Sequence, residues 1–253
     1  NLPKHPSVLM ESALLHSVQQ ESVSIALNQQ GVASSKKISN IQGETVMFIL
    51  SKFQEIESGE RSGFFLGDGT GCGKGRIISA VIQELLLTHK KKKAVWLSVS
   101  QDLENDSKRD LNDIGCHIQT CNLLDKEYPE NGVMFATYSS IVKPKRLCDL
   151  REWLGDDFDG LIAMDECHKA KQCNGNKSKT ASTIILFVEW SKKPMLQFSY
   201  ISSIKYNPRG VYGKSFDLLF AQVLESSSSS SVSSRSSVLK FYRQSLAFLP
   251  VYV

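Results

Sequence analysis

The sequence predicts an α/β fold with a mainly parallel sheet flanked by helices, followed by a low-complexity C-terminal tail. Four short apolar runs alternate with polar, helix-compatible stretches, a pattern that right-handed crossovers join into a parallel sheet. The runs are Phe64–Leu66, Ala94–Ser98, Val133–Thr137 and Leu161–Met164. Because ligands of such sheets bind at the carboxyl ends of the strands, we expect the functional side chains directly after these runs.

The helices before and after the first strand show apolar residues at helical spacing. Residues 41–56 predict one helix, and the turn-rich stretch 57–63 predicts a loop before the strand. A second helix follows the glycine-rich segment and ends near His89, so the predicted order is strand, glycine loop, helix. The apolar residues that define the two helices are Val46, Ile49, Leu50 and Phe53 in the first and Ile77, Ile78, Val81, Ile82, Leu85 and Leu86 in the second.

Composition divides the chain into three parts. Residues 1–40 are polar, weakly patterned and interrupted by prolines, so we expect an extended leader. Residues 41–210 contain the apolar runs and form the expected domain. Residues 211–253 include the unbroken serine run Ser226–Ser231, which cannot bury apolar surface and predicts a flexible tail.

The overall composition is that of a soluble globular chain. The 253 residues carry a formal charge of +4 and 41% are hydrophobic, which argues against a disordered or collagen-like body. The longest apolar run, Thr183–Val188, is far short of the roughly 18 residues that suggest a transmembrane helix, so no membrane span is expected. No basic segment followed by an apolar stretch is seen at the start, but the sequence begins at Asn1 rather than Met, so its targeting cannot be fully read.

Neither the net charge nor the cysteines identify a ligand. The charge is too small to predict nucleic-acid binding, and the basic groups at 89–93 and 143–146 are typical of solvated loops or helix ends. The six cysteines include no C-x-x-C pair, and Cys167, His168 and Cys173 fit no common spacing of metal ligands. We therefore expect reduced thiols and no zinc site.

The glycine-rich segment has the composition of a phosphate-binding loop, with a purely structural turn as the alternative. Glycines let backbone N–H groups approach phosphates, and the N-terminus of the following helix adds positive charge. Two positions depart from the general P-loop pattern, because Asp68 replaces the first glycine and Gly75 replaces a metal-binding hydroxyl. The residues expected to contact the nucleotide are Gly69, Thr70, Gly71, Cys72, Gly73, Lys74, Gly75 and Arg76.

Two adjacent carboxylates, Asp165 and Glu166, follow the last apolar run. Ionised groups are unfavourable to desolvate, so a pair leaving a buried strand is unusual, with a solvated loop start as the alternative. A nucleotide hydrolase needs such a pair. Asp165 would hold Mg²⁺, and Glu166, beside the metal, would orient and deprotonate the attacking water.

Four longer segments carry a family resemblance: GFFLGDGTGCGKGR, AVWLSVSQDLENDSKRDLNDIG, VMFATYSS and DDFDGLIAMDECHKAK. In the same order, they resemble the N-terminal helicase-like domain of the strawberry notch family, which belongs with the superfamily 2 DExH/DEAD-like ATPases. The resemblance extends from about Ile41 to Thr180. It implies a RecA-like ATP-binding domain over residues 41–210, a nuclear protein and a role in transcriptional regulation. Gly75 after Lys74 also resembles that family's own form of the loop.

The resemblance also implies roles for single residues. Lys74 corresponds to the phosphate-binding lysine, and Asp165 with Glu166 to the Walker B pair. His168 corresponds to the residue that couples the nucleotide state to the rest of the motor. Gln42 lies where related ATPases carry a glutamine that recognises adenine, although exposure to solvent is the alternative for a lone glutamine on a helix.

Two further polar segments follow strands on the same predicted edge of the sheet. Hydroxyl and N–H groups there could hold the phosphates of a nucleic-acid strand without reading its sequence. Ordinary polar loops are the alternative. The candidate residues are Ser98, Ser100 and Gln101 after one strand and Thr137, Tyr138, Ser139 and Ser140 after the other.

Two functional classes stay open at this point. The first is the ATPase of a DNA- or chromatin-directed motor, which the intact Lys74, Asp165 and Glu166 favour. The second is a nucleotide-binding scaffold or transcription co-regulator that acts through transcription-related protein partners without strand separation. Motors of this superfamily close ATP between two RecA-like domains. Because these residues predict only one, a second is expected in the complete protein.

Overall fold

The computed structural model describes residues 2–6, 27, 32, 36–54, 56–57, 60–61, 63–66, 72–88, 92–167, 179–191 and 199–203. The expected serine-rich tail, residues 211–253, lies outside these ranges. The helices are α2 (Asn40–Gln54), α3 (Lys74–Thr88), α4 (Leu103–Asp113), α5 (Tyr138–Ile141), α6 (Pro144–Leu154) and α7 (Lys179–Ser191). The strands are β1 (Ile56–Glu57), β2 (Glu60–Arg61), β3 (Phe64–Leu66), β4 (Lys93–Ser98), β5 (Thr120–Asn122), β6 (Gly132–Thr137), β7 (Leu161–Met164) and β8 (Ser199–Ser203).

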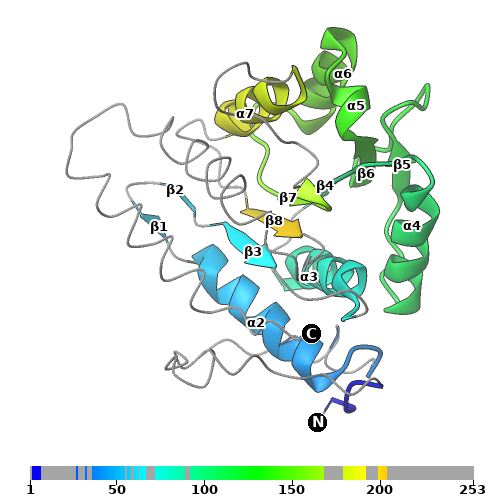
Figure 1. Ribbon diagram of the computed structural model, residues 1–253, viewed down its shortest axis with the longest axis vertical. Coiled ribbons are helices and arrows are strands. Elements are labelled where there is room, and N and C mark those ends of the chain that lie inside the picture. Colours follow the sequence, from blue (N-terminus) through cyan, green and yellow to red (C-terminus); the bar gives the residue numbers. More distant parts are fainter. Residues whose placement is uncertain are drawn as a thin grey trace, which may run out of the picture.

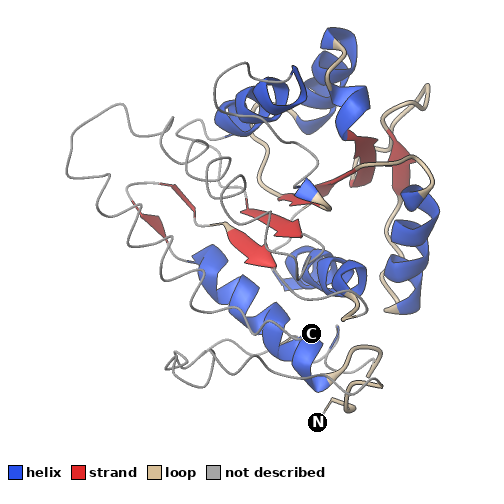
Figure 2. Cartoon of the chain, in the orientation of Figure 1, coloured by secondary structure: helices blue, strands red, loops and turns tan. Residues whose placement is uncertain are grey.

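Six parallel strands form the central sheet, in the order β3-β8-β7-β4-β6-β5. Parallel neighbours require crossover connections, which the helices supply. Figure 1 shows α2 and α3 on one side of the sheet and α5, α6 and α7 on the other. The secondary structure drawn in Figure 2 confirms the predicted α/β fold with a parallel sheet flanked by helices.

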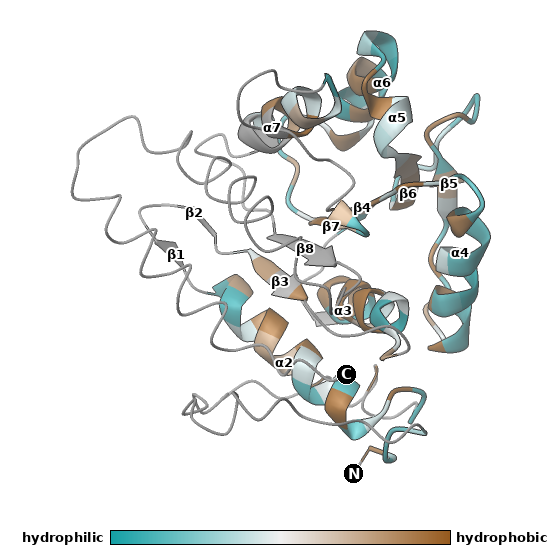
Figure 3. Cartoon of the chain, in the orientation of Figure 1, coloured by the Kyte–Doolittle hydropathy of each residue, from teal (hydrophilic) through white to brown (hydrophobic). Residues whose placement is uncertain are grey.

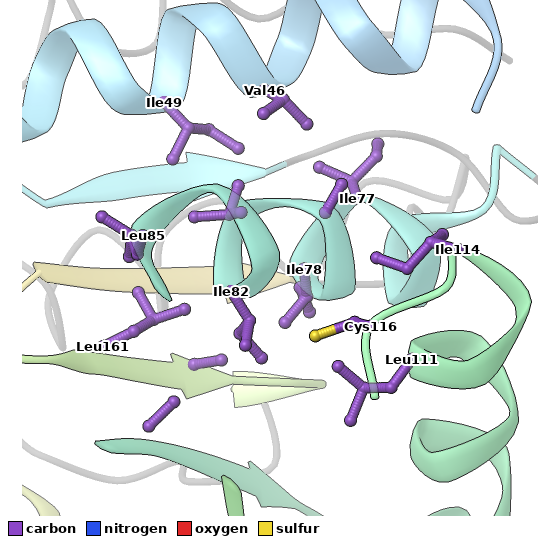
Figure 4. Close-up of a cluster of buried hydrophobic side chains, with 14 of the residues drawn as sticks. Val46, Ile49, Ile77, Ile78, Ile82, Leu85, Leu111, Ile114, Cys116 and Leu161 are labelled. Carbon is purple, nitrogen blue, oxygen red and sulfur yellow. The ribbon is translucent and has the colours of Figure 1, made fainter. Parts of the chain in front are cut away.

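Each face of the sheet packs against its own hydrophobic core. Successive side chains of a strand point to opposite faces, and β4 illustrates this alternation. Val95 and Leu97 pack with α5, α6 and α7, whereas Trp96 packs with α2 and α3. Figure 4 shows the second core, in which Val46 and Ile49 of α2 point toward α3. This two-sided burial explains why the central strands are continuous apolar runs.

Helix α3 is the buried helix of this core. Ile78, Ala80 and Val81 are fully buried, and Figure 3 shows α3 largely hydrophobic, whereas α4 is largely hydrophilic. The packing of α3 between α2 and α4 holds its first turn, which begins with Lys74, against the rest of the fold. None of the described helices is long and apolar enough to cross a bilayer.

The long apolar runs form the elements that the sequence predicts. β3 and β7 have the predicted bounds, and β4 and β6 each begin one residue earlier. The stretch 57–63, predicted as a loop, instead contributes β2 and the end of β1, which pair antiparallel. The additional elements β5, α5 and α6 are short or amphipathic, so no long apolar run identifies them.

Some of the described residues of the leader pack against the core, whereas others, including Lys4 and Lys36, are exposed. Val32 and Ile38 are buried in the α2–α3 core, and Leu2 packs against it. Gly43 makes room for Leu2, because a Cβ at this position would meet the leucine Cδ1 atom. The N–H of Asn40 donates to the carbonyl oxygen of Pro3 at 2.7 Å, so the leader also contacts the start of α2.

Candidate functional site

The predicted phosphate lysine and the predicted acidic pair lie at one edge of the sheet. Lys74 begins the helix that follows β3, and Asp165 and Glu166 follow β7, with β8 between the two strands. Because all three strands are parallel, their carboxyl ends meet at the same edge (Figure 1). The loop residues Gly69, Thr70 and Gly71 and the predicted coupling residue His168 lie outside the described residues.

The first turn of α3 provides backbone donors at this edge. The N–H of Ile77 donates to the carbonyl oxygen of Gly73 at 3.1 Å, so the N–H groups of Lys74, Gly75 and Arg76 precede the helical hydrogen-bond ladder. Gly73 has a φ of +77°, a conformation that glycine adopts without strain. A helix N-terminus that begins with lysine is a favourable site for an anion.

Gln42 is buried and contacts the glycine-rich loop at Cys72, so the alternative of an exposed glutamine is wrong. Its Oε1 accepts from the N–H of Ser39 at 3.0 Å, and its Nε2 donates to the carbonyl oxygen of Cys72 at 2.9 Å. The N–H of Gln42 donates to Ser39 Oγ at 3.3 Å, which completes a capping box at the start of α2. Each end of the amide retains capacity for one more hydrogen bond. Recognition of adenine by Gln42 stays a prediction.

Gly75 departs from the general loop pattern because a carboxylate occupies the adjacent space. A Cβ at this position would meet Oδ2 of Asp110, which projects from α4. Serine or threonine, the usual residues here, would therefore clash with Asp110. Next to this contact, Arg76 forms a 2.9 Å ion pair with Asp113. The first turn of α3 is thus packed directly against α4, a relation that the sequence does not reveal.

Asp165 is held by three hydrogen bonds from two neighbouring segments. Its N–H donates to the carbonyl oxygen of Leu97 at 2.8 Å, which continues the β4–β7 pairing. Ser98 Oγ donates to the Oδ2 atom of Asp165 at 3.1 Å. The hydroxyl of Tyr138 donates to the carbonyl oxygen of Asp165 at 2.7 Å. Burial raises the pKa of Tyr138 well above its usual value, so this hydroxyl remains a donor.

The chain turns sharply at Glu166, whose φ is +52°. This left-handed conformation is rare for residues other than glycine and stores of the order of 1–3 kcal/mol, which proteins concentrate at functional sites. Cys167, the next residue, is buried in the core that packs against α7. Glu166 therefore lies between two anchored neighbours, with its own side chain partly exposed.

The hydroxyl residues predicted to contact nucleic acid fall into two groups. Ser98, Thr137 and Tyr138 are buried, and Thr137 caps α5 by accepting from the N–H of Ser140 at 3.1 Å. Ser139 is exposed and Ser100 is partly exposed. The accessible hydroxyls also bond within the protein: Ser139 Oγ lies 3.0 Å from Thr137 Oγ1, and Ser100 Oγ donates to Asp102 Oδ2 at 3.2 Å. Contact with nucleic acid stays a prediction for both groups, and exposure makes Ser100 and Ser139 the better placed residues for it.

A pocket of about 490 Å³ adjoins the phosphate loop at Gly73. It lies between the leader, the start of α2, the first turn of α3 and α4. Its lining is mainly basic: five lysine or arginine residues and one acidic residue, Asp110, contribute. Burial raises the pKa of the Asp110 carboxyl, against the opposing charges of Arg109 and Arg76. Sequence reasoning missed this pocket because its walls come from four separate segments, although the Ser39-x-x-Gln42 spacing marks one wall as a helix start.

Among known families, the chain matches the one described as P-loop containing NTP hydrolase pore-1, over residues 4–203. It is 38% identical over 186 residues to Protein FORGETTER 1 of Arabidopsis thaliana, covering 67% of this chain and 14% of that protein. It is 35% identical over 226 residues to Protein strawberry notch of Drosophila melanogaster, covering 79% of this chain and 14% of that protein. The chain thus spans about one seventh of the length of these curated relatives.

Solved structures with low sequence identity share the fold. The DUF1998 helicase MrfA bound to DNA is 13% identical, with a TM-score of 0.53 over 80% of this chain and 29% of that chain. The Sulfolobus solfataricus SWI2/SNF2 ATPase core in complex with dsDNA is 12% identical, with a TM-score of 0.50 over 68% of this chain and 32% of that chain. These likenesses show a RecA-like fold for the described sheet and helices. With the match over residues 4–203, they place the chain in the P-loop containing NTP hydrolase pore-1 family, as a helicase-related NTPase domain of the strawberry notch type.

Proposed function

We propose that this chain is the ATP-binding and ATP-hydrolysing domain of a DExH-type, strawberry notch-like protein. The proposal rests on the arrangement of three side chains at one edge of the sheet. Lys74 comes after β3, Asp165 and Glu166 come after β7, and only β8 lies between these two strands. Phosphoryl transfer depends on positioning and charge stabilisation, and these three side chains are the types that it requires.

The described residues fit a Mg²⁺-bound nucleoside triphosphate. The N–H groups of the first turn of α3 and the ammonium group of Lys74 would hold phosphate oxygens. The Asp165 carboxylate, oriented by its hydrogen bond from Ser98, would hold Mg²⁺, which prefers oxygen ligands. The metal would neutralise charge that develops on the phosphates. Glu166 would accept a proton from the attacking water.

The basic pocket beside Gly73 would receive the base and ribose of the nucleotide. It opens next to the phosphate loop, and its volume of about 490 Å³ is within the usual range for small-molecule sites. The amide of Gln42 lies in its wall with one N–H and one lone pair left. These match an adjacent acceptor and donor on an adenine ring, which supports ATP as the nucleotide.

We further propose that the complete protein acts on DNA or chromatin in the nucleus, in transcriptional regulation, with transcription-related proteins as partners. The names of two similar structures state DNA as their ligand. Ser100 and Ser139 lie at the same sheet edge as the proposed nucleotide site, where a nucleic-acid backbone would be within reach. A second RecA-like domain in the complete protein would close the site.

Calorimetric titration of ATP with Mg²⁺ tests the nucleotide proposal on this chain. Lys74→Ala removes a charged phosphate contact, so we expect affinity to fall about 10- to 100-fold. Lys92→Ala is the matched control, because Lys92 is exposed at the opposite end of β4 and should leave affinity unchanged. Equal ATP affinity for Lys74→Ala and the wild-type chain would contradict the proposal.

A further inference from the structure

We propose that Ser98 and Tyr138 are positioning residues for the carboxylate of Asp165, and that they set its affinity for Mg²⁺. The inference rests on the proposed function, in which Asp165 holds the metal. It assigns these two hydroxyls a role different from the nucleic-acid contact that the sequence predicts. It also explains why hydroxyl residues follow two strands that are otherwise continuously apolar.

The register of the sheet places Ser98 opposite Asp165. Leu97 of β4 pairs with Met164 of β7, so the next residues along each strand face each other. Side chains in register point to the same face. Trp96 of β4 packs toward α3, which puts Ser98, two residues later, on the face where α3 begins with Lys74. The Ser98 hydroxyl therefore approaches Asp165 on the side of the proposed phosphate site.

Tyr138 donates a hydrogen bond to the backbone of Asp165. Its ring is buried in the core on the opposite face of the sheet, against α5–α7. From there its hydroxyl reaches the carbonyl oxygen of Asp165. The carboxylate is thus fixed from one face and the backbone from the other. With the N–H of Asp165 bonded to Leu97, both the backbone and the side chain have defined positions.

The chemistry of these bonds favours positioning over packing. Ser98 is fully buried, and a buried hydroxyl that did nothing but fill space would be better replaced by a methyl group. Its single O–H donates to one carboxylate oxygen of Asp165, Oδ2. A hydrogen bond to a carboxylate is also stronger than one between neutral groups. The hydroxyl therefore selects one rotamer of Asp165.

The test separates affinity for ATP from the gain that Mg²⁺ provides. ATP is titrated into the full 253-residue chain with excess Mg²⁺ and again with EDTA, and the ratio of the two affinities is the Mg²⁺ gain. We expect Ser98→Ala to reduce this gain about tenfold while affinity in EDTA stays unchanged. Ser98→Thr keeps the hydroxyl and should restore most of the gain. Tyr138→Phe, which removes only the oxygen, should reduce the gain less, by about threefold.

A hydroxyl away from the proposed site provides the control. Thr183 Oγ1 donates to the carbonyl oxygen of Lys179 at 2.8 Å within α7, and Thr183→Ala should leave the Mg²⁺ gain unchanged. A Ser98→Ala chain with the wild-type Mg²⁺ gain would overturn the inference and leave the proposed function intact. An equal loss of affinity with Mg²⁺ and in EDTA would indicate a general structural effect and would also overturn it. A wild-type chain that binds no ATP would instead overturn the proposed function itself.

Discussion

Gly75→Ser would supply the hydroxyl that the general P-loop pattern places after the lysine, yet we expect it to destabilise the protein. A Cβ at position 75 would meet Asp110 Oδ2, and the Asp110 Cγ would lie only 3.3 Å away. The Asp110 side chain is not free to swing aside without loss. Its Oδ1 lies 3.5 Å from a guanidinium nitrogen of Arg109, and the Arg76–Asp113 ion pair flanks it.

Two opposing contributions set the change in the free energy of unfolding that Gly75→Ser would cause. Adding atoms to a tightly packed contact commonly costs about 1–3 kcal/mol. The lower part of that range applies because the group that must move is the end of a short side chain rather than backbone. Serine recovers about 0.5 kcal/mol because glycine is the poorer helix former. The net loss is about 1 kcal/mol, which corresponds to a decrease of about 2–4 °C in Tm for a domain of this size.

Urea denaturation of the wild-type chain, both single variants and the double variant measures this coupling. In the Asp110→Ala background the obstructing carboxylate is gone, so Gly75→Ser should stabilise by about 0.5 kcal/mol. The two backgrounds should therefore differ by about 1.5 kcal/mol in their response to the same substitution. An identical response in both would show that Asp110 is not what excludes a side chain at position 75.

Four further substitutions test other parts of the structure. Asp165→Asn should weaken Mg²⁺-dependent ATP binding, whereas Glu166→Gln should preserve binding and lower hydrolysis about 10²-fold or more, measured with a second RecA-like domain present. Undiminished turnover with glutamine would exclude Glu166 as the base, and binding without any wild-type hydrolysis would favour a scaffold. Cys167→Ala should keep ATP binding and lower stability by about 1 kcal/mol, since this thiol is buried in the core, and zinc lost on substitution would contradict that role. For Glu104, burial raises the carboxyl pKa, but hydrogen bonds from Lys108, Asn122 and Gln101 outweigh it and hold the pKa below its usual value. Glu104→Gln should therefore destabilise at pH 7, with the difference in stability closing as the pH falls through the lowered pKa of Glu104, and thermal denaturation at pH 7 and in acid measures it.

The central strands could be predicted from sequence because both of their faces are buried. β4, β6 and β7 are each continuous apolar runs, and such runs admit few other structures when turn residues bound them. The segment after β6 was ambiguous for a physical reason. A hydroxyl that caps a short helix and a hydroxyl that binds a phosphate have the same sequence signature. In the structure, Thr137 and Ser140 form a capping box.

The contacts that define the site could not be predicted, because they depend on register and on helix packing. Nothing in the sequence tells that Ser98 lies opposite Asp165, since the pairing of parallel strands leaves no local signal. The same holds for Gly75. The side chain that occupies the space beside it belongs to Asp110 of α4, which lies 35 residues later in the sequence. A departure from a motif therefore has to be judged against the neighbours that the fold supplies, which for Gly75 include the Asp110 carboxylate.

The two adjacent acids, which look equivalent in the sequence, have side chains that are both partly exposed, and they differ in their backbone conformation. Asp165 is fixed through its N–H, its carbonyl oxygen and its carboxylate, and such fixing would suit its proposed role as a metal ligand. Glu166 has a φ of +52° and a partly exposed side chain at the point where the chain leaves the sheet edge. The proposed general base would need access to water, which the partly exposed Glu166 has, and the strained backbone is what distinguishes it from Asp165. Because a glycine would relieve that strain, the presence of glutamate at this position supports the proposed role of its carboxylate.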